Sequence, residues 1–269
     1  MFVSPSPELS AALALHAAEL GPFGSVQYLD EADSTNDLAL KLAATGAAEG
    51  TSVLADRQRA GRGRRGHVWF SPAGAGVYLS IVLRPDSRAL PLVTMACGVA
   101  VATALTQLTS LPIELKWPND VVIARPWRKL GGLLCESSTT GSQVAAVVAG
   151  IGVNILSSAF PPEIASRATS LELELGRPIA RERVVVEILR QVRQVSERLR
   201  RGDLVGICDD WRRFGQAGLD GPRVRWDDGR GMRDGIARDI DDSGALLVET
   251  NGQVERIIAG DVTWDGFSS

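Results

Sequence analysis

A run of glycine and arginine at residues 61–66 constrains the fold of this chain more than any other stretch. It reads Gly-Arg-Gly-Arg-Arg-Gly between two apolar segments, and Arg57 and Arg59 lie just before it, in a chain whose formal net charge is −3. Glycine lets the backbone approach a ligand closely, and guanidinium groups present paired donors to phosphate or carboxylate oxygens. The run therefore predicts a mobile loop that closes over an anion at the end of a sheet.

Two known phosphate-binding loops share parts of this spacing, but the residues that follow exclude both. Gly61, Gly63 and Gly66 have the GxGxxG spacing of a dinucleotide-binding fold, whose loop must open a helix that faces the pyrophosphate. Here a break at residues 70–74 and a second predicted strand at 76–83 follow instead. The spacing of a P-loop is also met, yet the next two residues are His-Val in place of Lys-Ser or Lys-Thr. What remains is a loop that binds anions through its side chains.

Length and composition indicate a globular chain with one large domain and one small domain. With 269 residues, of which 45% are hydrophobic, the chain can bury a full core. Its acidic balance argues against a general nucleic-acid binder, because such proteins need a basic excess to neutralise phosphates. We therefore expect no DNA partner.

We also expect a cytoplasmic protein without a membrane partner. No apolar run approaches the roughly 18 residues that span a bilayer, and residues 1–8 lack the basic start of a signal peptide. Cys97, Cys135 and Cys208 are widely spaced and form no disulfide or metal-ligand pattern, so we interpret them as buried thiols.

Hydrophobic periodicity predicts an α/β (α+β) domain over residues 1–217, with an N-terminal helix within residues 1–26. Helices are predicted where apolar residues recur at helical spacing, at 8–20, 37–44, 92–108, 179–201 and 204–214. Strands are predicted where short apolar runs end at turn residues, at 26–29, 51–56, 76–83, 113–117, 121–123, 130–136 and 144–155.

The pattern changes at a glycine-rich linker, residues 215–222, which marks a boundary near residue 218. Beyond it, Asp-Gly, Ser-Gly and Asn-Gly turns separate short alternating segments. This is typical of a small β-barrel, with strands predicted at 223–226, 233–239, 245–249, 254–258 and 261–264. Residues 218–269 are therefore predicted to form the second domain.

A turn and a lysine in the middle of the chain carry chemistry that complements the arginine loop. Residues 116–120 read Lys-Trp-Pro-Asn-Asp, and Lys129 is one of only three lysines in the chain. Asp120 and Lys129 could flank one reacting centre, with the carboxylate orienting an amine and the ammonium holding an oxyanion. The alternative is a packed Trp-Pro turn with a surface ion pair, and these residues alone leave both open.

The Ser-Thr-Asn sequence at residues 34–36 also has two interpretations. Ser34 can cap the helix at 37–44, and Asp37 completes a capping-box pattern. Alternatively, the two hydroxyls and the amide line a pocket for a polar ligand.

Taken together, the motifs of this chain resemble those of the biotin protein ligases. The likeness extends over about residues 28 to 264, and it rests on the order and spacing of all the motifs, since no single one would suffice. The motifs are Ser-Thr-Asn at 34–36, Gln58 with the run at 61–66, Trp69 and Ser-Pro at 71–72, Lys-Trp-Pro-Asn-Asp at 116–120, Lys-Leu-Gly-Gly at 129–132, Gly-Ile-Gly-Val-Asn at 150–154 and Gly-Ile-Ala-Arg-Asp-Ile-Asp at 235–241.

The resemblance implies both a fold and an activity. The family has a catalytic domain with a mixed sheet and helices, related to class II aminoacyl-tRNA synthetases, followed by a small SH3-like β-barrel. It adenylates biotin with ATP and Mg²⁺, releases pyrophosphate, and transfers biotin to a lysine of a biotin carboxyl carrier protein. By this resemblance we expect biotin and ATP as small-molecule substrates, Mg²⁺ as the metal, and a carrier domain of a biotin-dependent carboxylase as the protein partner.

The resemblance also implies roles for residues at matching positions. The implied biotin-binding residues are Ser34, Thr35, Asn36, Gln58, Gly61, Arg62, Trp69 and Gly132. The implied nucleotide-binding residues are Arg62, Arg64, Arg65, Asn119, Lys129, Asn154 and Arg238, with Mg²⁺ held mainly through phosphates. Arg62 and Arg64 would contact the biotin carboxylate and the α-phosphate. The implied catalytic residues are Lys129, Asp120 and Arg64: Lys129 would stabilise charge in both steps, and Asp120 would orient or deprotonate the carrier lysine.

The chain departs from the family pattern at His67, where an arginine is common, so a phosphate contact there would be weaker or pH-sensitive.

Fewer than thirty residues precede the catalytic domain, whereas bifunctional members carry a winged helix-turn-helix there, so we do not expect transcriptional repression. The association state is expected to be a monomer or a ligand-promoted homodimer.

Two alternatives to a biotin ligase are open. One is a lipoate or octanoate ligase of the same superfamily, which would need an apolar channel for a fatty chain. The other is a non-catalytic biotin or adenylate sensor, which would have no need of Lys129.

Overall fold

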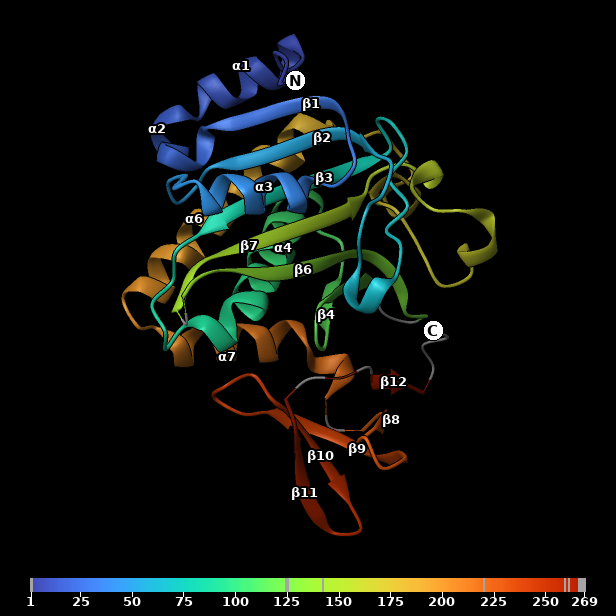
Figure 1. Ribbon diagram of the computed structural model, residues 1–269. Helices are drawn as coiled ribbons and strands as arrows, with labels where there is room; N and C mark the ends of the chain where they lie inside the picture. Colours follow the sequence, from blue (N-terminus) through green and yellow to red (C-terminus); the bar gives the residue numbers. More distant parts are fainter. Residues whose placement is uncertain are drawn as a thin grey trace.

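The computed structural model describes residues 2–123, 126–141, 143–219, 221–258, 260 and 262–265 (Figure 1). Within them, seven strands form one sheet in the order β1-β2-β3-β7-β6-β5-β4, and five form a second sheet in the order β11-β10-β9-β8-β12. The predicted α/β class with a small C-terminal β domain is confirmed.

The large sheet is mixed. Its first two strands, β1 and β2, run parallel, and every other neighbouring pair is antiparallel. A parallel pair needs a crossover, which α3 (Thr35–Ala44) provides. The strands are β1 (Val26–Ala32), β2 (Ser52–Gln58), β3 (Gly76–Leu83), β4 (Ile113–Lys116), β5 (Asp120–Ile123), β6 (Arg128–Thr140) and β7 (Gln143–Asn154).

Helices cover both faces of this sheet, and its inner strand β3 is buried along its whole length (Figure 1). The long helices α4 (Val93–Thr109) and α6 (Arg181–Arg200) pack on one face, and α3 packs on the other. Successive strand residues point to opposite faces. In β3, for example, Ile81 belongs to the core beneath α4 and α6, and Val82 belongs to the core beneath α3.

The segment that contains helix α4 contradicts the expectation that no apolar run approaches the length of a membrane span. Leu90–Thr109 is long and apolar enough to cross a membrane, with a mean hydropathy of 1.6, and it is the one such segment in the described part of the chain. However, 67% of it is buried inside the protein. It therefore has the character of a core helix, whose sides face the sheet, α6 and α7 (Leu204–Phe214).

Two local predictions needed correction. The single helix predicted at 8–20 is broken at His16, whose ψ of 13° ends α1 (Pro7–Leu15) before α2 (Ala17–Leu20) begins. The segment after β7, for which we predicted no element, contains α5 (Leu171–Leu175) and two short 3₁₀ turns, η4 (Ser157–Ala159) and η5 (Pro162–Ile164). The remaining 3₁₀ turns are η1 (Gly21–Gly24), η2 (Arg64–Gly66), η3 (Leu90–Leu92) and η6 (Gln216–Gly218).

The C-terminal sheet is antiparallel throughout, and its five strands lie within the segments of the chain predicted to form strands or within a residue or two of them. Its elements are β8 (Arg223–Asp227), β9 (Met232–Ile240), β10 (Leu246–Thr250), β11 (Gln253–Ile257) and β12 (Val262–Trp264). Asp261, predicted as the first residue of the last strand, lies outside the described residues.

A tight turn at residues 241–244 fastens this sheet to the large domain. The indole nitrogen of Trp117 donates to the carbonyl of Gly244 at 2.9 Å, and Arg212 of α7 donates to the carbonyl of Ile240 at 2.8 Å. Asp241 organises the turn, because its carboxylate accepts from the amides of Ser243 (2.9 Å) and Ala245 (3.0 Å). The middle motif 116–120 is thus joined directly to the C-terminal sheet.

We predict that Asp241→Ala lowers the free energy of unfolding by about 1–3 kcal/mol, because two backbone amides lose their acceptor. Burial alone would raise the pKa of Asp241. Hydrogen bonds from Ser243, Ala245 and Arg256 lower it by more, so the pKa is about 2. Since this folded-state pKa lies below the ordinary value of 3.8, the stabilisation is present above about pH 4 and is lost as the pH falls towards 2. Denaturant unfolding at several pH values measures both effects. Asp242→Ala is the control, since that side chain is 79% exposed, and equal losses in the two variants would contradict the prediction.

Candidate active site

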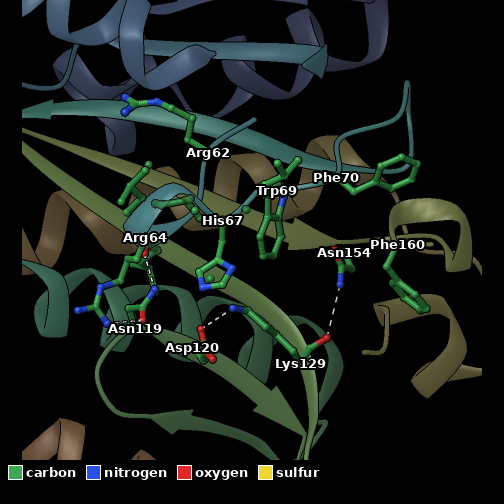
Figure 2. A pocket seen from close by; sticks show the side chains of 18 of the residues that line it. Arg62, Arg64, His67, Trp69, Phe70, Asn119, Asp120, Lys129, Asn154 and Phe160 are labelled. Carbon is green, nitrogen blue, oxygen red and sulfur yellow. Dashed lines mark hydrogen bonds and ion pairs between the residues drawn. The ribbon is translucent and has the colours of Figure 1, made fainter. Parts of the chain in front are cut away.

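A cavity of about 770 Å³ opens at the end of the large sheet (Figure 2). This volume lies in the range of small-molecule sites. Its walls come from the start of α3, the loop between β2 and β3, the β4–β5 turn, strands β6 and β7, the segment 159–168 and β12. The cavity therefore joins motifs that lie more than two hundred residues apart in the chain.

Most of the residues singled out from the sequence line this cavity. They are Ser34, Thr35, Asn36, Gln58, Arg62, Arg64, Trp69, Asn119, Asp120, Lys129, Gly132 and Asn154. Three others do not line it: Gly61, Arg65 and Arg238. Arg238 lies in β9, where its guanidinium pairs with Glu249 at 2.9 Å.

One end of the cavity is a buried polar network around the Ser-Thr-Asn sequence. The backbone amide and the hydroxyl of Thr35 donate to Gln58 Oε1 at 2.9 and 3.1 Å, and the Ser80 hydroxyl donates to Asn36 Oδ1 at 2.6 Å. Ser34 both accepts from the amide of Asp37 at 3.4 Å and lines the cavity. The capping role and the pocket role are therefore compatible.

Glycines on β6 and β7 form the floor beneath this network. A Cβ on Gly150 would lie 2.2 Å from Asn36 Oδ1, and one on Gly152 would lie 2.5 Å from the Trp69 ring. Gly132 is the cross-strand neighbour of Gly152 and also faces Trp69. A side chain at either β7 position would displace the residue above it.

The arginines of the glycine-arginine loop and its approach are mostly paired with acids of the same chain. Arg57 pairs with Glu31, and Arg59 pairs with Asp33 at 2.7 Å. Arg62 pairs with two carboxylates, described below. Arg64 contacts the Asn119 side chain and the carbonyl of Gly260, both at 3.4 Å.

The other end of the cavity holds the lysine and the carboxylate from the middle of the chain (Figure 2). Lys129 Nζ lies 2.6 Å from Asp120 Oδ1 and 5.5 Å from the centroid of the Trp69 ring. Lys116 Nζ lies 3.9 Å from the other oxygen of Asp120. The Asp120 side chain is only 14% exposed, so this ion pair lies within the cavity and not on the outer surface.

Burial also keeps the hydroxyl of a tyrosine on the cavity wall protonated. Tyr78 in β3 donates its hydroxyl to the carbonyl of Pro72 at 3.0 Å, next to the base of the arginine loop. Burial raises the pKa of Tyr78 well above its ordinary value of 10, so it stays a neutral donor near neutral pH.

Sequence reasoning missed two parts of the wall. The segment 159–168 has no periodicity, and its only signal is Phe-Pro-Pro at 160–162, soon after the Gly-Ile-Gly-Val-Asn strand end. The segment 159–168 is hydrogen-bonded to β6, since the Lys129 amide donates to the carbonyl of Arg167 at 2.8 Å. The second part is Val262 and Thr263 of the C-terminal sheet, which no local pattern could assign to a site in another domain.

Family models match both domains of this chain. Residues 28–154 match the Biotin/lipoate A/B protein ligase family, and residues 227–263 match the Biotin protein ligase C terminal domain.

Curated relatives match most of the length. The Biotin--[acetyl-CoA-carboxylase] ligase of Mycobacterium tuberculosis is 35% identical over 237 residues, which cover 85% of this chain and 85% of that protein. The protein of the same name from Paracoccus denitrificans is 34% identical over 247 residues, covering 88% and 100%. The Bifunctional ligase/repressor BirA of Bacillus subtilis is 35% identical over 239 residues, covering 87% and 72%.

A solved structure shares the fold. The biotin protein ligase from Aquifex aeolicus in complex with biotin and ATP superposes with a TM-score of 0.77 at 28% identity, covering 89% of this chain and 98% of that one. Sequence and fold agree over nearly the whole length, and the chain belongs to the biotin protein ligase family.

Proposed function

We propose that this chain adenylates biotin with ATP to form biotinyl-5′-AMP and then transfers biotin to a lysine of a biotin carboxyl carrier protein. The observation that carries the proposal is the content of one cavity: a polar network at one end, and an ammonium–carboxylate pair at the other, with Trp69 of the arginine loop between them. Relatives that match most of the chain are named biotin--[acetyl-CoA-carboxylase] ligase.

The biotin end is assigned to the polar network and the wall beside it. Donors and acceptors from Ser34, Thr35, Asn36 and Gln58 suit the ureido group, which carries both N–H and C=O. Trp69 adds a flat apolar wall above Gly132, and the backbone at Gly61 lies within the same loop. The pocket thus offers polar recognition at its buried end and apolar contact along its side.

The nucleotide end is assigned to the residues around Lys129. Arg64, Asn119 and Asn154 line the cavity with it and are proposed to bind phosphate and ribose. Arg65 and Arg238 do not line the cavity, so a role for them requires the loop and the C-terminal sheet to move over the nucleotide.

In the first step a carboxylate oxygen of biotin attacks the α-phosphorus of ATP. A carbon–oxygen–phosphorus link forms, the bond to the β-phosphate oxygen breaks, and pyrophosphate leaves. Negative charge develops on the phosphoryl oxygens, and the Lys129 ammonium and Arg64 guanidinium are the cationic groups assigned to stabilise it. The loop excludes water, which would hydrolyse the mixed anhydride.

In the second step the carrier lysine attacks the acyl carbon, a carbon–nitrogen bond forms, and AMP leaves. The amine must first give up a proton, and Asp120 is the carboxylate assigned to orient or accept it. Asp120 already binds the Lys129 ammonium at 2.6 Å. When Lys129 turns to the phosphate, the same oxygen can receive the ammonium of the carrier lysine.

Mg²⁺ is proposed to enter with the nucleotide. It keeps several waters and needs only one or two protein oxygens when phosphates supply the rest. In the described part of the chain no three His, Cys, Asp or Glu side chains form a metal cluster, but Asn119 and Asp120 offer oxygens beside Lys129. Such a metal would neutralise phosphate charge during the first step.

Other parts of the proposal stand on the sequence alone. They are a cytoplasmic location, a monomer or ligand-promoted homodimer, and the absence of a DNA partner. Among the alternatives, a lipoate or octanoate ligase is disfavoured because buried polar side chains line one end of the cavity, and a pure sensor has no need of the Lys129–Asp120 pair.

We expect biotin to support exchange of labelled pyrophosphate into ATP, and octanoate or lipoate to support none, because a fatty chain offers no hydrogen-bonding group to the polar network. The assay measures label in ATP with each acid at equal concentration. Exchange with octanoate as fast as with biotin would overturn the choice of substrate.

Lys129→Ala should lower the rate of biotin adenylation by about 10²-fold or more, as for the loss of one preorganised donor to a developing charge. Lys41→Ala is the matched control, because that lysine is exposed on α3. Single-turnover formation of the adenylate gives the rate, and thermal unfolding checks the fold. A folded Lys129→Ala protein with near-normal adenylation would remove Lys129 from the mechanism.

Backbone amides of residues 61–70 should exchange with solvent more slowly when biotin and ATP are added. Glycines at 61, 63 and 66 loosen this segment, and its Val68 is 80% exposed. Hydrogen exchange read by mass spectrometry compares the loop with β3, which should not change. The same exchange rate in both states would contradict a loop that closes over the adenylate.

A further inference from the structure

The guanidinium of Arg62 lies between two carboxylates of its own chain. Its Nη2 atom is 2.6 Å from Asp37 Oδ1 and 2.7 Å from Glu136 Oε2. Figure 2 shows the Arg62 side chain directed away from Arg64, Asp120 and Lys129. Neither Asp37 of α3 nor Glu136 of β6 has any role in the function proposed above.

Glu136 connects this arginine to the polar network at the biotin end. The same oxygen, Oε2, also accepts from Asn36 Nδ2 at 2.8 Å. Asn36 in turn accepts from Ser80, whose hydroxyl lies 2.8 Å from that of Thr35. A continuous chain of hydrogen bonds therefore runs from the arginine loop to the groups assigned to biotin.

Two carboxylates compensate the charge of one guanidinium. A substrate anion that approached this guanidinium would face both carboxylates at close range with like charge. The two bonds use both hydrogens of Nη2 and draw that nitrogen towards α3 and β6, so the guanidinium is held beside acids and is poorly placed to serve as an anion clamp.

Holding Arg62 also holds the rest of the loop. Arg62 forms an isolated β-bridge with Val68, and the amide of Gly63 donates to the carbonyl of His67 at 2.7 Å. The amide of Trp69 donates to the carbonyl of Gly61 at 2.9 Å. The loop is thus a small hairpin with one side-chain anchor near its start and Trp69 at its end.

We propose that Arg62 is a positioning residue, tethered by Glu136 and Asp37, which holds the loop hairpin and Trp69 over the biotin end of the cavity. Its guanidinium serves to place the loop, and the anions of the reaction are left to Arg64 and Lys129. The inference rests on the proposed biotin adenylation, since it names residues that govern biotin binding at that site.

The experiment is a double-variant cycle made of Arg62→Ala, Glu136→Gln and both together, with Asp37→Asn as a second test of the anchor. Biotin-dependent pyrophosphate exchange gives KM for biotin and kcat, and calorimetry gives biotin affinity without ATP. Arg59→Ala is the matched control, because Arg59 pairs with Asp33 and Glu31 outside the cavity. Wild-type exchange is measured first: its absence would defeat the proposed function, and the tether is then judged from calorimetry and loop hydrogen exchange.

The tether predicts that Glu136→Gln weakens biotin binding as Arg62→Ala does. Both should raise KM for biotin about fivefold, the scale of a partly exposed ion pair, with kcat changed less than about twofold. The double variant should be no worse than Arg62→Ala alone, and amides 61–70 should exchange faster in each.

A direct anion ligand predicts the opposite pattern. Releasing Arg62 from Glu136 would then leave KM unchanged or lower it, Arg62→Ala would lower kcat, and the two effects would add. Either that pattern or an unchanged KM in all three variants overturns the tether. Should Glu136→Gln fail to fold, Asp37→Asn decides by the same criteria.

Discussion

The site depends on a close approach of side chains to the bare backbone of β7. Along the face of β7 that carries α3, residues change from Ala146 and Val148, which pack under the helix, to Gly150 and Gly152. Asn36 lies on the first glycine and Trp69 on the second, at distances where no Cβ would fit. The hydrophobic contact between α3 and the sheet therefore ends where the cavity begins, and the missing side chains form its volume.

This floor explains why two loops that come from different strands meet. The Ser-Thr-Asn turn and the arginine loop both rest on it, and Gln58 joins them by accepting from Thr35 and donating to Ser71 at 2.9 Å. Buried polar groups at such a place must find partners, since an unpaired one costs about 1–3 kcal/mol. Their bonds to one another hold a polar pocket ready in an otherwise apolar sheet.

Electrostatics near the loop differ from what its composition indicates. Five arginines within nine residues predict a strongly positive surface, yet Arg57, Arg59 and Arg62 pair with acids from β1, α3, β6 and the β1–α3 turn. These pairs neutralise charge on the approach to the cavity, whereas Lys129, Lys116 and Arg64 line its other end together with Asp120. The C-terminal sheet contributes there too, because Thr263 lines the cavity and the Gly260 carbonyl binds Arg64.

The sequence alone determined the elements and the chemistry of this protein. Strand β3 was predicted with its observed ends, most other strands and the long helices within a few residues, because their apolar periodicity spans many residues. The proximity of Lys129 and Asp120 was inferred as one possibility, because the chain has only three lysines and Lys129 follows the Asn-Asp turn closely. Weakly periodic segments, such as the broken helix at His16 and the turns of 157–168, were missed or merged.

Only the tertiary structure decided which charges face the cavity. The sequence does not indicate which acid an arginine will pair with. Glu136 lies seventy-four positions from Arg62 and reaches it only once β6 has entered the sheet. The same holds for Trp117 and Gly244, whose hydrogen bond joins the two domains. Local pattern specifies helices, strands and reactive groups, whereas long-range packing sets the partner of each charge and so its role.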